Sequence, residues 1–233
     1  VALLRGWNGS NDLLSPAPSV WTAVWEAWLR RVAGARFPAH LVSLVAGQCG
    51  AIARNLLLGQ EKAPPWFAGQ SLATELEHST VAAMSWLQEQ LGPAEAPDSP
   101  DSADKHPWRW GAVHTVTWRH PLSEHGPQAQ RVAAGLVFDV GPFPTTGGAG
   151  TLRAAGHSAA RPFQVIGGST YRMVADLSPA GGLLATTTTG QSGHPGSPHY
   201  ADQAPLWLGD TYHPFPINPI DGEDAEGVTR IVP

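Results

Sequence analysis

The chain has 233 residues, 42% of them hydrophobic, so it is long enough to bury an apolar core. Its 14 Lys and Arg residues against 19 Asp and Glu give a formal net charge of -5, which argues against a phosphate-binding surface and excludes nucleic acid as an expected partner. Because no apolar run reaches the ~20 residues that span a bilayer, no membrane span is expected.

The first predicted helix begins at Ser15–Pro16 and ends at Gly34. Its apolar residues recur at helical spacing: Val20, Trp21, Val24, Trp25, Trp28, Leu29 and Val32. Three tryptophans on one stripe suit either core packing or an aromatic ligand. We favour core packing, because large aromatic residues at helical spacing usually bury their area.

Two more helical regions follow the first. Residues 38–59 have a helical pattern that is interrupted near Gly47 and Gly50, and residues 71–91 have a continuous one. We therefore predict a helical segment over residues 1–92.

The pattern changes after this segment. Residues 93–107 contain no large apolar residue and are rich in Pro, Ser and Asp, which predicts an exposed loop. Beyond it, residues 113–120, 170–177 and 182–189 alternate with the period of two that is typical of strands, so residues 108–233 are predicted to be rich in sheet. Helices first and strands afterwards predict an α+β fold, with helices packed on a mostly antiparallel sheet.

The stretch TTGQSGHPGSPHYADQ, residues 188–203, has neither period. Its glycines and prolines exclude a helix interior or a central strand, so it is predicted to be a loop. Ser197 and Pro198 resemble an N-cap followed by the first residue of a helix through HYADQAPLWL. The loop is therefore expected to be ordered by its ends.

His194 and His199 in this loop could ligate a metal. However, no acidic or cysteine ligands accompany them at a recognisable spacing, so an ordered structural loop is favoured over a zinc site.

Asp176 is the carboxylate with the most suggestive position. It follows the predicted strand YRMVA and shares a side with Arg172 and Val174. A carboxylate near a sheet end can orient a catalytic base, and a solvated strand terminus is the alternative.

Five blocks of the sequence carry a resemblance to a known family. In chain order they are LLRGWNG, SPAPSVWTAVWEAWL, WGAVHTVTWRHPL, GGSTYRMVADLS and TTGQSGHPGSPHYADQAPLWLGDTY. Together they resemble the carboxy-terminal part of the β subunit in the penicillin acylase (penicillin amidase) family. That family includes penicillin, cephalosporin and acyl-homoserine-lactone acylases.

The resemblance implies an N-terminal-nucleophile hydrolase whose core is an αββα sandwich. A precursor cleaves itself to free a serine, and the amine of that serine serves as base for attack on an amide carbonyl. The implied activity is hydrolysis of linear amides in penicillin-like or N-acyl substrates, in the periplasm or after secretion. The implied partners are the amino-terminal portion of the acylase and a small-molecule amide. No cofactor is implied for this chain, and a structural calcium ion is implied for full-length members.

The family's nucleophile, oxyanion-hole asparagine and calcium ligands are expected upstream of these blocks. Val1 has neither hydroxyl nor thiol, so the chain alone is expected to be inactive. Ser10 in GSND imitates the maturation junction, but it lies inside the LLRGWNG block and a helix-entry loop is favoured. A noncatalytic binding or structural module derived from the same fold remains the alternative function.

The resemblance also bears on Asp176. In the cephalosporin acylase branch, a glutamate in the corresponding strand supports a histidine near the nucleophile, and block alignment places Asp176 at that position. Aspartate is one methylene shorter, so a catalytic supporting role and a structural hydrogen bond or solvated strand end both stay open.

Overall fold

A computed structural model describes residues 2–94, 105–158, 161–178 and 182–215 of the chain. The chain divides into two compact units. Unit 1 comprises Val1–Thr117 and Gly141–Gly168, and unit 2 comprises Trp118–Val140 and Ser169–Pro233.

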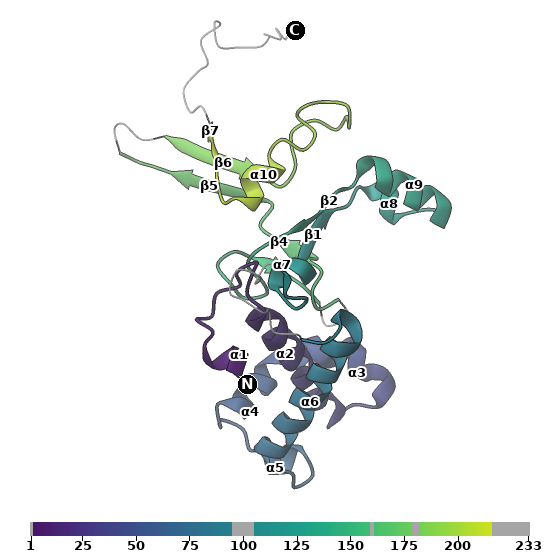
Figure 1. Cartoon of the computed structure of the whole chain (residues 1–233), viewed down its shortest axis with the longest axis vertical. Helices are drawn as coiled ribbons and strands as arrows, with labels where there is room; N and C mark the ends of the chain where they lie inside the picture. Colours follow the sequence, from purple (N-terminus) through teal and green to yellow (C-terminus); the bar gives the residue numbers. More distant parts are fainter. Residues whose placement is uncertain (1, 95–104, 159–160, 179–181, 216–233) are drawn as a thin grey trace, which may run out of the picture. The chain divides into compact units, whose positions relative to one another are not determined.

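Unit 1 contains most of the helices (Figure 1). Its helical elements are α1 (Ala2–Arg5), α2 (Ala17–Gly34), α3 (Ala39–Val45), the 3-10 helix η1 (Ala46–Cys49), α4 (Gly50–Leu57), α5 (Ala63–Trp66), α6 (Leu72–Leu91) and α7 (Trp110–Val113). Two short two-stranded sheets accompany them, formed by β1 (Thr115–Trp118) with β2 (Val140–Pro144) and by β3 (Ala155–Gly156) with β4 (Gly167–Gly168).

Helix α2 is the centre of unit 1. It packs against α6 and also contacts α1, α3, η1, α4 and α7. Of the predicted apolar stripe, Trp28, Leu29 and Val32 lie in one core cluster and Val20 in a second. The core prediction is wrong for Trp21, whose residue surface is 43% exposed.

The other predicted helices are confirmed with their boundaries. The interruption near Gly47 is the 3-10 turn η1 between α3 and α4. Helix α6 begins after Ser71, whose hydroxyl accepts a hydrogen bond from the Thr74 backbone N–H at 3.2 Å. It ends at Gly92, whose φ of 81° favours glycine at a helix end.

Unit 2 contains a three-stranded antiparallel sheet in the order β5-β6-β7 (Figure 1). Its elements are α8 (Pro121–Glu124), α9 (Gln128–Phe138), β5 (Tyr171–Ala175), β6 (Leu183–Thr187), α10 (Ala204–Leu208) and β7 (His213–Phe215). In the register of the sheet, Met173 pairs with Ala185, which pairs with His213. Helix α10 contacts β6, and the α+β class is confirmed.

Helix α9 is not among the predicted elements, and it lies in the segment 108–233 that is predicted to be rich in sheet. It has no buried residue, and three of its large apolar side chains are exposed, namely Val132, Leu136 and Val137. The predicted segment boundaries at residues 92 and 107 stay a prediction, because 95–104 lie outside the described residues.

Within the described ranges, no helix combines the length and the apolar character that crossing a membrane requires.

Candidate functional site

The loop of residues 188–203, here called the signature loop, is tied to strand β6 at its end. The Gln203 backbone N–H donates to the Thr189 carbonyl at 2.7 Å, and the Gln203 side-chain Oε1 accepts from the Thr187 backbone N–H at 2.8 Å. Because Gln203 is buried, both bonds are shielded from water. The loop therefore has an ordered base, as the sequence predicts.

A close approach of two backbone segments shapes the loop internally. The Ser192 N–H donates to the His199 carbonyl at 3.0 Å. At Gly190, an added Cβ would lie 2.0 Å from that same carbonyl oxygen. Only glycine fits there, because any side chain would overlap backbone atoms.

The prediction that Ser197 and Pro198 begin a helix is wrong. The Ser197 hydroxyl accepts from the His199 N–H, two residues along, which closes a local turn instead of capping a helix. The helix α10 begins later, at Ala204, with Pro205 in its first turn.

The two histidines of the loop make local polar contacts. His194 Nδ1 accepts from the Gly196 N–H at 3.0 Å, and His199 Nδ1 lies 2.9 Å from Asp202 Oδ2. In the part of the chain that the structure describes, no three His, Cys, Asp or Glu side chains are placed to hold a metal ion.

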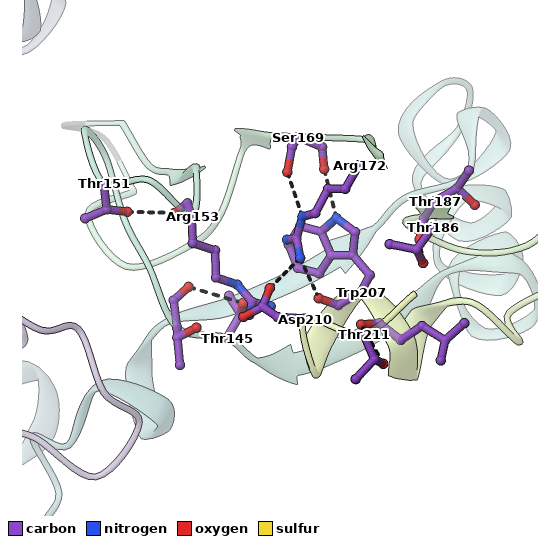
Figure 2. A network of polar contacts seen from close by, with 12 residues as sticks. Thr145, Thr151, Arg153, Ser169, Arg172, Thr186, Thr187, Trp207, Asp210 and Thr211 are labelled. Atoms are coloured by element: carbon purple, nitrogen blue, oxygen red, sulfur yellow. Dashed lines mark hydrogen bonds and ion pairs between the residues drawn. The ribbon is translucent and has the colours of Figure 1, made fainter. Parts of the chain in front are cut away.

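Arg172 on β5 connects the strand to the segment that follows the signature loop (Figure 2). Its guanidinium donates to Ser169 Oγ at 3.0 Å and to the Trp207 carbonyl at 2.9 Å, and it pairs with Asp210. The guanidinium carbon also lies 4.2 Å from the centre of the Trp207 ring, a cation–π distance. These contacts join residues of the blocks GGSTYRMVADLS and PLWLGDTY into one network, here called the Arg172 framework.

A cavity of about 290 Å³ lies between the signature loop and the segment WRHP, residues 118–121, in unit 2. Trp118, His120, Thr188, Ser192 and Tyr200 are among its lining residues. It is the place where two of the resembling sequence blocks meet. Polar and aromatic groups share its wall, so it can accommodate a small molecule or a side chain.

Asp176 directly follows β5 and is exposed. Its Oδ1 accepts from the Ser178 N–H at 2.9 Å, and this hydrogen bond lowers the pKa of the carboxyl below its ordinary value. The carboxylate is therefore ionised and faces outward. Its supporting role in catalysis stays a prediction.

Ser10 lies in the turn that leads from α1 to α2. Its hydroxyl donates to Asp12 Oδ1 at 2.8 Å, and its backbone N–H donates to Asn8 Oδ1 at 2.8 Å. The Ser10 nitrogen is an amide in this chain, so it cannot act as the basic amine of an N-terminal nucleophile.

Unit 1 holds a cluster of one glutamate and two histidines that is not among the sites predicted from the sequence. Glu26 of α2 is 5% exposed, and its Oε1 lies 3.8 Å from Nε2 of the half-buried His157. His114 is fully buried, and its ring centre lies 6.3 Å from that of His157. Its ring stacks on Trp110 with centroids 4.1 Å apart.

Burial controls the charge of all three groups. It raises the pKa of Glu26, against the opposing effect of the Arg30 charge. It lowers the pKa of His157 and lowers that of His114 to about 4. The histidines are therefore neutral in the folded unit at neutral pH.

One sequence signal could have revealed Glu26. It is three residues from both Ala23 and Leu29, which are buried on α2, so it shares their face. A carboxylate on the buried face of a helix is unusual enough to mark a site. His157 follows no periodic element, and nothing in the pattern placed it beside α2.

A comparison with known protein families shows to which family the chain belongs. The sequence pattern of the family described as penicillin amidase matches residues 1–223. The chain belongs to the penicillin amidase family. The family resemblance of the five sequence blocks is thereby confirmed.

Several proteins that carry acylase names are similar to the chain. The acyl-homoserine lactone acylase QuiP of Pseudomonas aeruginosa is 27% identical over 186 residues, covering 75% of this chain and 21% of that protein. QuiP of Pseudomonas fluorescens is 29% identical over 180 residues, covering 75% and 19%. Penicillin acylase 2 proenzyme of Pseudomonas sp. is 28% identical over 204 residues, covering 88% and 24%. The chain spans about a fifth of the length of these relatives.

Proposed function

We propose that the chain is the carboxy-terminal portion of an acylase that hydrolyses the linear amide bond of N-acyl substrates, of the acyl-homoserine lactone or penicillin type. The nucleophilic serine and the oxyanion donors come from an amino-terminal portion of the same enzyme. Membership of the penicillin amidase family and the similarity to QuiP support this proposal. The sheet of unit 2 provides the structural argument.

The sheet β5-β6-β7 exposes apolar side chains on both faces. The register places Met173 and Tyr171 on one face, 55% and 50% exposed, and Val174 with Leu184 on the other, 48% and 42% exposed. A sheet that is apolar on both faces is typical of a layer buried between two others. This observation carries the proposal, because an αββα sandwich would cover both faces.

The reaction itself depends on groups outside this chain. An acyl transfer of this kind needs a nucleophile, a base and donors for the oxyanion, each of which contributes orders of magnitude to the rate. The signature loop, the Arg172 framework and the sheet would shape the enzyme around that centre. The structural calcium ion of the family would likewise be held upstream, as the family resemblance implies.

Two purified proteins test the proposal, the chain alone and the precursor whose carboxy-terminal part it forms. Each is assayed with a chromogenic phenylacetyl amide and with N-acyl-homoserine lactones, and release of the free amine is measured. We expect turnover by the processed precursor and none by the chain alone, a difference of roughly a thousandfold or more.

Two results would contradict this expectation. Turnover by the chain alone that Ser10→Ala abolishes would place the nucleophile at Ser10. A processed, folded precursor without turnover on any acyl amide would favour the noncatalytic module. Periplasmic or secreted location is part of the proposal and is tested by fractionating cells that express the precursor.

Asp176 is the positioning residue of this proposal. In the precursor, Asp176→Asn keeps the shape of the side chain and removes its charge, so we expect turnover to fall about tenfold at an unchanged melting temperature. A shift in the pH profile of turnover, and partial rescue by Asp176→Glu, would distinguish orientation of a histidine from a structural role.

The matched control is Glu124→Gln, which removes an exposed charge on α8 of the same unit. It is expected to leave turnover unchanged. Equal turnover of wild type and Asp176→Asn would disprove the positioning role.

A further inference from the structure

Unit 1 contains a cavity of about 700 Å³ at the surface of helix α2. Its wall comes from five parts of the unit, namely the turn before α2, α2 itself, the α3–η1 region, α7 and the loop of residues 148–158. Asn11 fixes one side of it, because Asn11 Nδ2 donates to the Gly147 carbonyl at 3.0 Å, as does Trp110 Nε1 at 3.0 Å. The cavity therefore has an ordered frame, and its volume suits a small organic molecule.

Indole rings form much of the cavity wall. Trp7, Trp21, Trp25 and Trp110 all line it. The Trp21 and Trp25 rings are stacked with centroids 6.1 Å apart, and the Trp7 and Trp21 centroids lie 6.3 Å apart. The faces of such rings carry negative electrostatic potential and attract cations. This wall also explains why Trp21 is not in the core.

The charge in the cavity has one sign. Among the described lining residues, Glu26 is the one acidic side chain, and none is Lys or Arg. Its side chain is more than nine-tenths buried, and Oε2 makes no hydrogen bond within the described chain. His157 also lines the cavity, and its Nδ1 has no hydrogen-bond partner there either.

An unpartnered buried carboxylate is costly, and the cost falls when a cation with N–H donors replaces the lost hydration. Burial raises the pKa of Glu26, and the charge of Arg30 offsets this effect only in part. His157 cannot fill this role well, because its distance to Glu26 of 3.8 Å exceeds that of a hydrogen bond and burial lowers the pKa of its ring.

We propose that this cavity binds a small organic ammonium ion, with the ammonium group at Glu26 and the apolar body against Trp21 and Trp25. The inference does not require the acylase activity. It does have a consequence for it, because amide hydrolysis of an acyl-homoserine lactone turns a neutral amide nitrogen into a primary ammonium. The site would therefore distinguish the released amine from the intact substrate.

Calorimetric titration of the whole 233-residue chain tests the site. The probes are phenethylammonium and its neutral isostere 2-phenylethanol, with homoserine lactone as a second ammonium. We expect phenethylammonium to bind at least about tenfold more tightly than the alcohol, because the carboxylate and the indole faces both favour the cation. Tighter binding of homoserine lactone than of phenethylammonium would indicate that the natural ligand is the amine released by the acylase reaction. Tighter binding of phenethylammonium would indicate an unrelated aromatic amine.

Glu26→Gln should remove the preference for the cation, with a loss of about tenfold in phenethylammonium affinity. Glu77→Gln, an exposed acid on α6, is the matched control and should bind as the wild type does. Trp25→Leu should weaken every aromatic probe. Equal affinity of the wild-type chain for phenethylammonium and 2-phenylethanol would overturn the proposal. This comparison uses only the wild-type chain, so it does not depend on whether a variant folds.

Discussion

Replacing Gly190 by alanine is expected to open the signature loop. The new methyl group would lie 2.0 Å from the His199 carbonyl oxygen and 2.7 Å from Asp202 Oδ1. The first of these is a backbone atom, held by the Ser192 N–H, so it cannot turn away as a flexible side chain can. Either the two backbone segments of the loop move apart or the Ser192–His199 hydrogen bond breaks. We expect this to destabilise the closed loop by about 3 kcal/mol.

Hydrogen exchange measures this effect directly. A cost of about 3 kcal/mol corresponds to roughly a hundredfold faster exchange of the loop amides that the structure protects, such as those of Ser192 and Gln203. Cleavage of the loop by a protease should accelerate in parallel. In the precursor, turnover would fall if the loop shapes the active-site surroundings.

Gly193 provides a matched control in the same loop. A Cβ added there would meet no heavy atom within 4 Å, and its φ is not in the left-handed region. Gly193→Ala should therefore leave exchange and proteolysis as they are in the wild type. If Gly190→Ala and Gly193→Ala behave alike, the close backbone approach does not hold the loop.

The two long helices of unit 1, α2 and α6, were predictable because their signals are local. Helix α6 has a serine N-cap at Ser71 and a glycine at its end, and both act within one turn of the chain. The sequence pattern alone could not place Trp21, since a helical stripe wider than its contact surface leaves some members outside the core. Burial depends on which residues of other elements pack against the helix, and the spacing of apolar residues along the helix does not specify them.

The signature loop shows the opposite case. Its position and its order were predicted, yet its helix was placed too early. Ser197 followed by Pro198 suits a helix start and a tight turn equally well. Contacts across the loop decide between them, above all the Ser192–His199 hydrogen bond, and such contacts are not visible from neighbouring residues.

The cluster of Glu26, His114 and His157 could not be assembled from the sequence, because its members come from three distant segments. Helix α9 was missed for a different reason. It has the composition of a helix but follows a strand-like block, so the sheet predicted for residues 108–233 extends across it.

Acidification is expected to destabilise unit 1 through His114. This ring is fully buried, and its Nδ1 lies 3.0 Å from the Phe163 carbonyl, which can only accept, so Nδ1 carries the proton of the neutral ring. Protonation of the bare Nε2, which has no hydrogen-bond partner in the described structure, would place a charge in the core. Burial accordingly lowers the pKa of His114 from 6.5 to about 4.

The folded pKa lies below the unfolded one, so the unfolded state binds the proton first as the pH falls. The stability that neutral His114 provides is complete above pH 6.5 and is lost progressively down to about pH 4. At 1.36 kcal/mol for each pKa unit, the loss is about 3 kcal/mol. His157 acts in the same direction, since burial lowers its pKa too. Glu26 acts in the opposite direction, because its raised pKa lets the folded state hold a proton more tightly.

Urea unfolding at a series of pH values between 7 and 4, followed by tryptophan fluorescence, measures the loss. Of the ten tryptophans, all but Trp118 and Trp207 belong to unit 1, so the signal reports mainly on that unit. His114→Asn keeps a donor near the Phe163 carbonyl and removes the titration, so it should be less stable than wild type at pH 7 and yet lose about 3 kcal/mol less on acidification. His40→Asn, at an exposed position in α3, should follow the wild-type curve. Parallel curves for wild type and His114→Asn would show that the acid sensitivity of unit 1 arises at another group, because a titration that has been removed cannot contribute to the slope.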